Sequence, residues 1–114
     1  MRRSSTAGRF AERVVESFDD AGAPERVVIW IERKAGGVWA VGRAVNPQNR
    51  PSDEPRPSDY VFEGYELQDA LDNANAVLED DVTVSEQDGR SAKTLPFKRS
   101  ELLGPLERWF FGRR

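Results

Sequence analysis

The chain has 114 residues, of which 17 are basic and 20 acidic, and its formal net charge is −3. This length suits one domain, residues 1–114, with a single hydrophobic core. The sequence contains neither cysteine nor histidine, which excludes disulfides, thiolate or imidazole metal sites and a histidine general base.

Residues 7–20 are predicted to form a helix. Their large apolar side chains follow helical spacing, and a glycine and a proline soon after residue 20 would end the helix. These apolar residues are Phe10, Val14, Val15 and Phe18.

Residues 27–45 carry the clearest signal in the chain, which is that of a β-hairpin. Two runs rich in β-branched and aromatic residues flank Gly36 and Gly37, which we interpret as a two-residue turn. Strand alternation around that turn places both tryptophans of the hairpin on one face among cations. The cations and tryptophans of this face are Trp30, Lys34, Trp39 and Arg43. The opposite face, predicted to receive a helix, carries Val27, Ile29, Ile31, Ala40, Gly42 and Ala44.

Residues 46–59 contain four prolines and are predicted to form a Pro-rich surface loop. Residues 60–65 are predicted to be a strand, with Gly64 marking a bulge.

Residues 67–80 give the clearest helix, because their apolar side chains form one continuous stripe. Asp80 and Asp81 lie at the C-terminal end of that helix, where the helix dipole is negative and disfavours carboxylates. A nearby Lys or Arg would relieve this repulsion.

The remaining segments predict a second hairpin and a terminal helix. Residues 82–86 are rich in β-branched side chains and are predicted to form a strand. Asp88 and Gly89 would turn the chain, so that residues 92–97 return as another strand. Residues 100–111 are helix-like. The predicted fold class is α+β: an antiparallel sheet of two hairpins and a middle strand, packed against two helices, with a C-terminal helical segment.

The charges are unevenly distributed along the chain. Residues 1–52 carry a net charge of +3, residues 53–88 a net charge of −11, and residues 89–114 a net charge of +5. The simplest interpretation is that the acidic segment attracts the basic ends within the fold or across a dimer. A second interpretation is that rows of carboxylates imitate nucleic-acid phosphates.

No nucleotide-binding or nucleophile motif is present, so we predict no enzyme activity, no catalytic residues, no cofactor and no bound metal. A small enzyme of unknown type is kept as an alternative. Residues 1–6 are basic, but the apolar stretch of a signal peptide does not follow, and no run approaches transmembrane length. We therefore predict a cytoplasmic protein without a membrane partner.

Two groups of aromatic and cationic residues form the candidate binding surface. The first is the hairpin face described above, and the second is the aromatic run near the C-terminus. Together these residues are Trp30, Lys34, Trp39, Arg43, Trp109, Phe110 and Phe111. Large aromatics with arginine are typical of protein interfaces, so we predict a non-catalytic interaction or regulatory module that self-associates as a homodimer. The alternative is single-stranded DNA or RNA binding, with bases stacked on the tryptophans and phosphates held by the cations.

Overall fold

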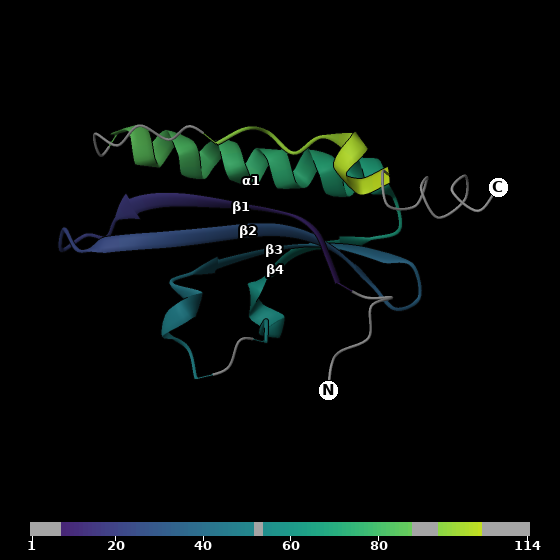
Figure 1. The fold of residues 1–114 in the computed structure, drawn as a ribbon, viewed down its shortest axis with the longest axis horizontal. Helices are drawn as coiled ribbons and strands as arrows, with labels where there is room; N and C mark the ends of the chain where they lie inside the picture. The colour runs from purple at the N-terminus through teal and green to yellow at the C-terminus, as the bar shows by residue number, and fades with distance from the viewer. Residues whose placement is uncertain (1–7, 52–53, 88–93, 104–114) are drawn as a thin grey trace.

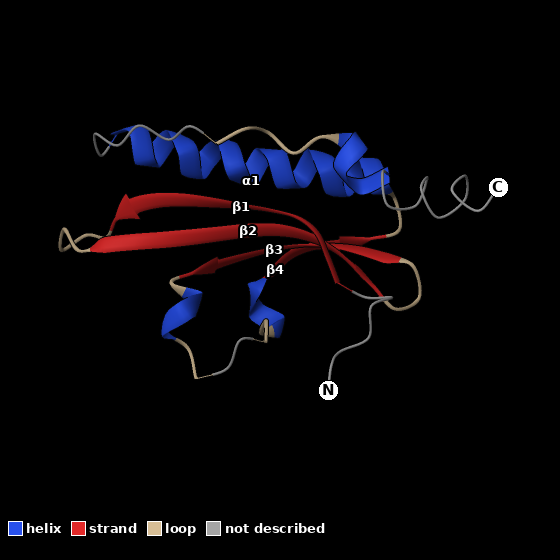
Figure 2. Cartoon of the chain, viewed as in Figure 1, coloured by secondary structure: helices blue, strands red, loops and turns tan. Residues whose placement is uncertain are grey.

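The computed structural model describes residues 8–51, 54–87 and 94–103. Its elements are β1 (Gly8–Phe18), β2 (Pro24–Lys34), β3 (Val38–Val45), the 3-10 helices η1 (Pro47–Asn49) and η2 (Pro57–Asp59), β4 (Tyr60–Gly64) and α1 (Leu67–Gln87). A short helix over residues 99–103 follows. The strands form one antiparallel sheet in the order β1-β2-β3-β4, and α1 lies across one face (Figures 1 and 2). The α+β class is confirmed.

The sheet buries side chains on both of its faces. The larger cluster lies between the sheet and α1, where Ile29, Ile31 and Val41 are fully buried against the helix residues Ala70 and Ala74. The smaller cluster lies on the face away from α1 and consists of Val28, Trp30 and Ala44, with Val14 and Tyr60 packed against it. Figure 1 shows η1 and η2 on this second side, so the Pro-rich loop borders the smaller cluster.

The helix predicted over residues 7–20 is wrong, because this segment forms β1. The eleven residues of β1 pair antiparallel with β2, and a bulge lies between Arg9 and Ala11. Ala11 and Val15 point into the larger cluster, whereas Val14 packs against the smaller one. That alternation is the period of a strand. Hydrogen bonding to β2 therefore outweighs the local helical spacing, since propensity is a weak signal next to tertiary pairing.

The hairpin is confirmed, but its predicted turn and register are wrong. Lys34 pairs with Val38, so the loop has three residues, and Gly36 and Gly37 have φ angles of 86° and 80°. Trp30 therefore pairs with Gly42 instead of Arg43. A shift of one residue moves every side chain of one strand to the other face.

Helix α1 confirms the helix predicted over residues 67–80 and extends it by two turns. The strand predicted over residues 82–86 is wrong, because the helix continues to Gln87. Its buried side keeps helical spacing through Leu78 to Ser85, which is fully buried. Thr83 donates its hydroxyl to the Glu79 carbonyl oxygen at 2.9 Å, which is how a β-branched hydroxyl residue is accommodated in a helix.

The other predicted elements have mixed outcomes. The strand at residues 60–65 is confirmed as β4, but its bulge lies at Val61, between the pairs Val41–Phe62 and Gly42–Tyr60, and not at Gly64. Residues 94–98 have no regular secondary structure, so the strand predicted at 92–97 is wrong over its described part. The turn at residues 88–89 and the end of the C-terminal segment lie outside the described residues. No helix in the described ranges is long and apolar enough to cross a membrane.

Candidate functional site

The two tryptophans of the predicted binding face lie on opposite sides of the sheet. Trp39 is 3% exposed in the larger cluster, where its ring meets that of Phe10 edge to face at 5.2 Å. Trp30 is 1% exposed in the smaller cluster. Neither indole therefore presents a ring face for stacking a base.

The two cations of the predicted face are both paired with carboxylates. Arg43 donates two hydrogen bonds of 2.8 Å to Asp81. This pair joins β3 to α1 and supplies the arginine that the acidic end of the predicted helix needed. Lys34 forms an ion pair with Glu63 and lies 3.7 Å from the centre of the Tyr60 ring. The second group of the predicted binding surface, Trp109, Phe110 and Phe111, lies outside the described residues.

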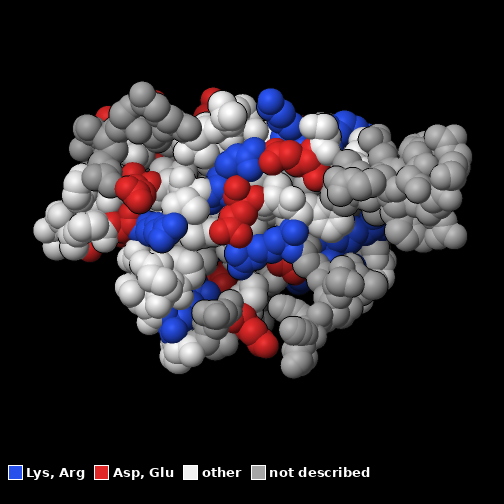
Figure 3. Space-filling model, viewed as in Figure 1, with Lys and Arg blue, Asp and Glu red and all other residues white. Residues whose placement is uncertain are grey.

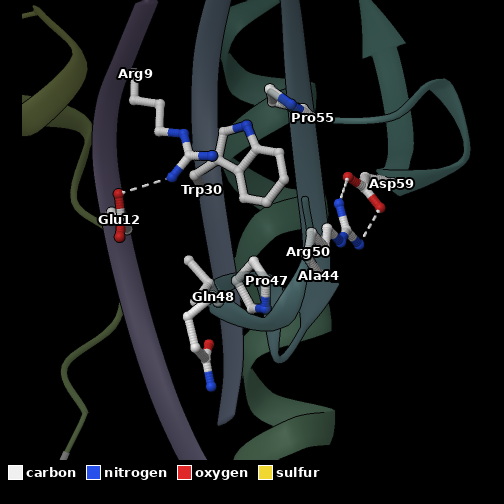
Figure 4. A pocket seen from close by; sticks show the side chains of 10 residues that line it. Arg9, Glu12, Trp30, Ala44, Pro47, Gln48, Arg50, Pro55 and Asp59 are labelled. Carbon is white, nitrogen blue, oxygen red and sulfur yellow. Dashed lines mark hydrogen bonds and ion pairs between the residues drawn. The ribbon is translucent and has the colours of Figure 1, made fainter. Parts of the chain in front are cut away.

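A pocket of about 240 Å³ opens between the sheet and the Pro-rich loop (Figure 4). Trp30 lines it, and the guanidinium of Arg9 lies 4.1 Å above the indole while donating to Glu12 at 3.0 Å. Arg50 and Asp59 line the loop side and share two hydrogen bonds of 2.6 and 2.8 Å. Each cation in the pocket thus has its own carboxylate, so the pocket has no excess positive charge to attract a phosphate.

Glu32 holds the aromatic side chains of this face in place. Its carboxylate accepts a hydrogen bond from the Trp30 indole at 2.6 Å and another from the Tyr60 hydroxyl at 2.9 Å. Burial, followed by the hydrogen bond to Glu32, raises the pKa of the Tyr60 phenol. The phenol therefore stays protonated and keeps donating, and the indole is fixed against the sheet.

The first edge of the sheet, β1, is covered by the chain itself. Ser85 on α1 donates to the Glu16 carbonyl oxygen at 2.6 Å. Thr94 donates to the Val14 carbonyl oxygen at 3.4 Å. Carbonyl oxygens that a neighbouring strand would use are therefore occupied, which is one way in which proteins protect a long edge strand.

The second edge of the sheet is β4. Within the described ranges, the main chain of residues 61–64 makes no hydrogen bond to an element other than β3. Two apolar side chains are exposed here, Val61 at 50% and Tyr65 at 75%. A shallow groove of about 500 Å³ runs along the strand, and Lys34, Pro55 and Pro57 complete its lining. This edge is the candidate functional site.

Sequence reasoning missed this site. Val61 and Tyr65 carry no motif, and their significance depends on the strand order, which places β4 at the edge. The available signal was the run of aromatic and β-branched residues at 60–62 next to a proline-rich loop, because prolines are typical of segments that flank edge strands.

A pH dependence of stability follows from two carboxyl groups. The hydrogen bonds from Arg50 lower the pKa of Asp59, and the hydrogen bond from Arg13 lowers that of Glu101. Above the pKa of about 4 that these carboxyls have in the unfolded chain, both make their full contribution to stability. That contribution is lost as the pH falls from about 4 through the lower pKa values of the folded state. We expect the free energy of unfolding, measured by urea titration, to fall steadily below about pH 4. In Asp59→Asn the free energy of unfolding should fall less steeply with decreasing pH. An unchanged pH dependence would contradict the stabilising role of the Asp59 carboxylate.

Charges of both signs lie side by side on the surface. On the face drawn in Figure 3, Lys and Arg side chains adjoin Asp and Glu side chains. Among the described residues, no three carboxylates are grouped to hold a metal ion. No protein-family model, no curated protein and no solved structure matches the chain.

Proposed function

We propose that this protein is a non-catalytic interaction module that forms a homodimer by pairing the β4 strands of two copies. The supporting observation is the difference between the two edges of the sheet. Side chains of α1 and of residues 94–103 cover β1. No described residue pairs with the outer edge of β4, and exposed apolar side chains flank it. An exposed strand edge is a template for pairing with another chain.

A second copy suits this edge because β4 is compatible with its own antiparallel partner. When Phe62 is placed on the two-fold axis, Tyr60 lies opposite Gly64 of the second copy and Val61 lies opposite Glu63. The single carboxylate of the strand thus avoids facing itself, which would be unfavourable. The contact is isologous and closes as a dimer with a continuous sheet across both copies.

The dimer is expected to be of modest affinity. The β4 strand has five residues and carries a bulge, and bulges and short length both limit edge pairing. Burial of Val61 and Tyr65 must therefore supply much of the free energy of association. We expect a concentration-dependent equilibrium of monomer and dimer instead of an obligate dimer.

The test is a lysine placed at the edge. We expect Val61→Lys to make the protein monomeric over a micromolar concentration range in which the wild type dimerises, measured by sedimentation equilibrium. Val84→Lys is the matched control, because Val84 is also 50% exposed but lies on α1. This control variant should dimerise like the wild type. A wild type that stays monomeric, or a Val61→Lys variant that dimerises normally, would reject the proposal.

We do not extend the proposal to nucleic acid. Stacking would need an exposed indole, and the two described indoles are buried.

A further inference from the structure

Residues 94–103 pack against both β1 and α1, and the surface of these two elements that they cover is called the groove. Figure 1 shows this yellow-green segment running along α1 in the opposite direction and ending in a short helix beside the start of α1. In the described ranges, no hydrogen bond joins the main chain of residues 94–98 to the main chain of another element. The segment is held instead by side chains of the groove, as a bound peptide would be.

Arg13 on β1 contacts four residues of the segment. Its guanidinium donates to the carbonyl oxygens of Leu95 at 2.8 Å and Pro96 at 3.0 Å. It also donates to the Glu101 carboxylate at 2.7 Å and lies 4.6 Å from the centre of the Phe97 ring. The two carbonyl contacts do not depend on side-chain identity, whereas the contacts to Phe97 and Glu101 select those residues.

Asn75 on α1 holds the segment from the other side. Its side-chain amide donates to the Phe97 carbonyl oxygen at 3.1 Å, and its oxygen accepts from the Phe97 amide at 2.8 Å. The side chain thus pairs with both main-chain groups of one residue, as a neighbouring strand would. This pairing requires an extended chain at Phe97 and tolerates any side chain there.

Two apolar anchors and a cap complete the contact. Phe97 is 3% exposed and Leu102 is fully buried, and both belong to the larger cluster. Glu101 accepts from the Lys98 amide at 2.8 Å. That is the contact of a residue at the third position of a helix with its N-cap, so it starts the short helix that aims Leu102 inward.

We propose that the groove between β1 and α1 is a binding site for peptides of the pattern Pro-Phe-x-x-x-Glu-Leu, occupied in this structure by the protein's own residues 94–103. The proline favours an extended backbone at the start of the peptide. The phenylalanine and leucine fill the two apolar positions, and the glutamate pairs with Arg13. A partner carrying this pattern must displace the internal segment. Its apparent affinity is therefore lowered by the millimolar effective concentration of a tethered competitor.

The experiment uses the full chain and a fluorescent peptide of residues 94–103. In the variant Phe97→Ala/Leu102→Ala the internal segment lacks its anchors, while the groove residues Arg13 and Asn75 are unchanged. Fluorescence anisotropy should show binding at least about tenfold tighter to this variant than to the wild type. A peptide with alanine in place of its phenylalanine should not bind. Equal affinity of the two proteins for the peptide, or no binding to a folded variant, would overturn the proposal.

If that variant fails to fold, hydrogen exchange of the wild-type protein tests whether residues 94–103 can leave the groove. A displaceable segment opens locally, so the Phe97 amide should exchange about 100-fold faster than the amides of β2, with little dependence on denaturant. Exchange of Phe97 only at the rate of global unfolding would make the segment an integral part of the fold and would overturn the proposal. Val61→Lys should leave peptide binding unchanged, so this site and the β4 dimer are tested separately.

Discussion

Gly42→Ala is expected to lower the free energy of unfolding by about 2–3 kcal/mol, at the upper end of the range for overpacking a core. A Cβ atom at residue 42 would lie 2.6 Å from Cη2 of Trp30, and closer still to Cζ2 and Cε2. Real Cβ contacts do not approach so closely. The indole donates a hydrogen bond to Glu32, and moving the ring away from residue 42 would strain or break this bond.

The control is Gly64→Ala, measured by the same urea denaturation. A Cβ atom at residue 64 would meet only the far end of the half-buried Phe62 side chain, at 2.9 Å, so a smaller loss is expected. The clash should also disappear when the indole is reduced. In the Trp30→Val background Gly42→Ala should cost much less, and this coupling identifies the contact. Equal losses in both backgrounds would show that the indole is not the cause.

Trp39→Ala is expected to lower the free energy of unfolding by about 3–5 kcal/mol, as for other large aromatics removed from a core. Trp39 is buried between the sheet and α1, where Phe10 meets its ring edge to face. The guanidinium of Arg33 lies 5.0 Å from its centre. Removal therefore leaves a cavity and ends both ring contacts.

The control for Trp39→Ala is Val84→Ala. Val84 is half exposed on α1, and surface substitutions of this kind change stability by no more than about 0.5 kcal/mol. The measurement is urea unfolding at a low protein concentration, where association contributes little. The sequence placed Trp39 on a binding face, and a stability loss below about 1 kcal/mol would favour that earlier interpretation.

Local signals predicted the elements that depend on nearby residues. The hairpin over residues 27–45, the strand at 60–65 and the helix from residue 67 were all recognised, because turn glycines and apolar periodicity act within a few residues. The end of α1 was not recognised. Val82, Thr83 and Val84 favour a strand locally, but the helix gains burial of Ser85 against β1 by continuing.

The candidate site was harder to predict than the fold. A two-residue turn at Gly36 and Gly37 puts Trp30 and Trp39 on one face, whereas the observed three-residue loop puts them on opposite faces. The exposure of Val61 and Tyr65 at an edge cannot be predicted from local sequence, because it depends on the strand order. Arg13 and Asn75 contact residues 94–101, and contacts across such a separation leave no mark in local periodicity.

The sequence by itself determined the α+β class, the absence of cysteine and histidine chemistry, and the positions of the hairpin and the main helix. These properties depend on composition, turn residues and side-chain spacing. Only the tertiary structure decided that residues 8–18 form a strand, which face Trp30 and Trp39 each occupy, and which sheet edge is open within the described ranges. Those outcomes depend on pairing between distant segments, where a one-residue change of register reverses every face and the hydrogen bonds of a partner strand outweigh local propensity.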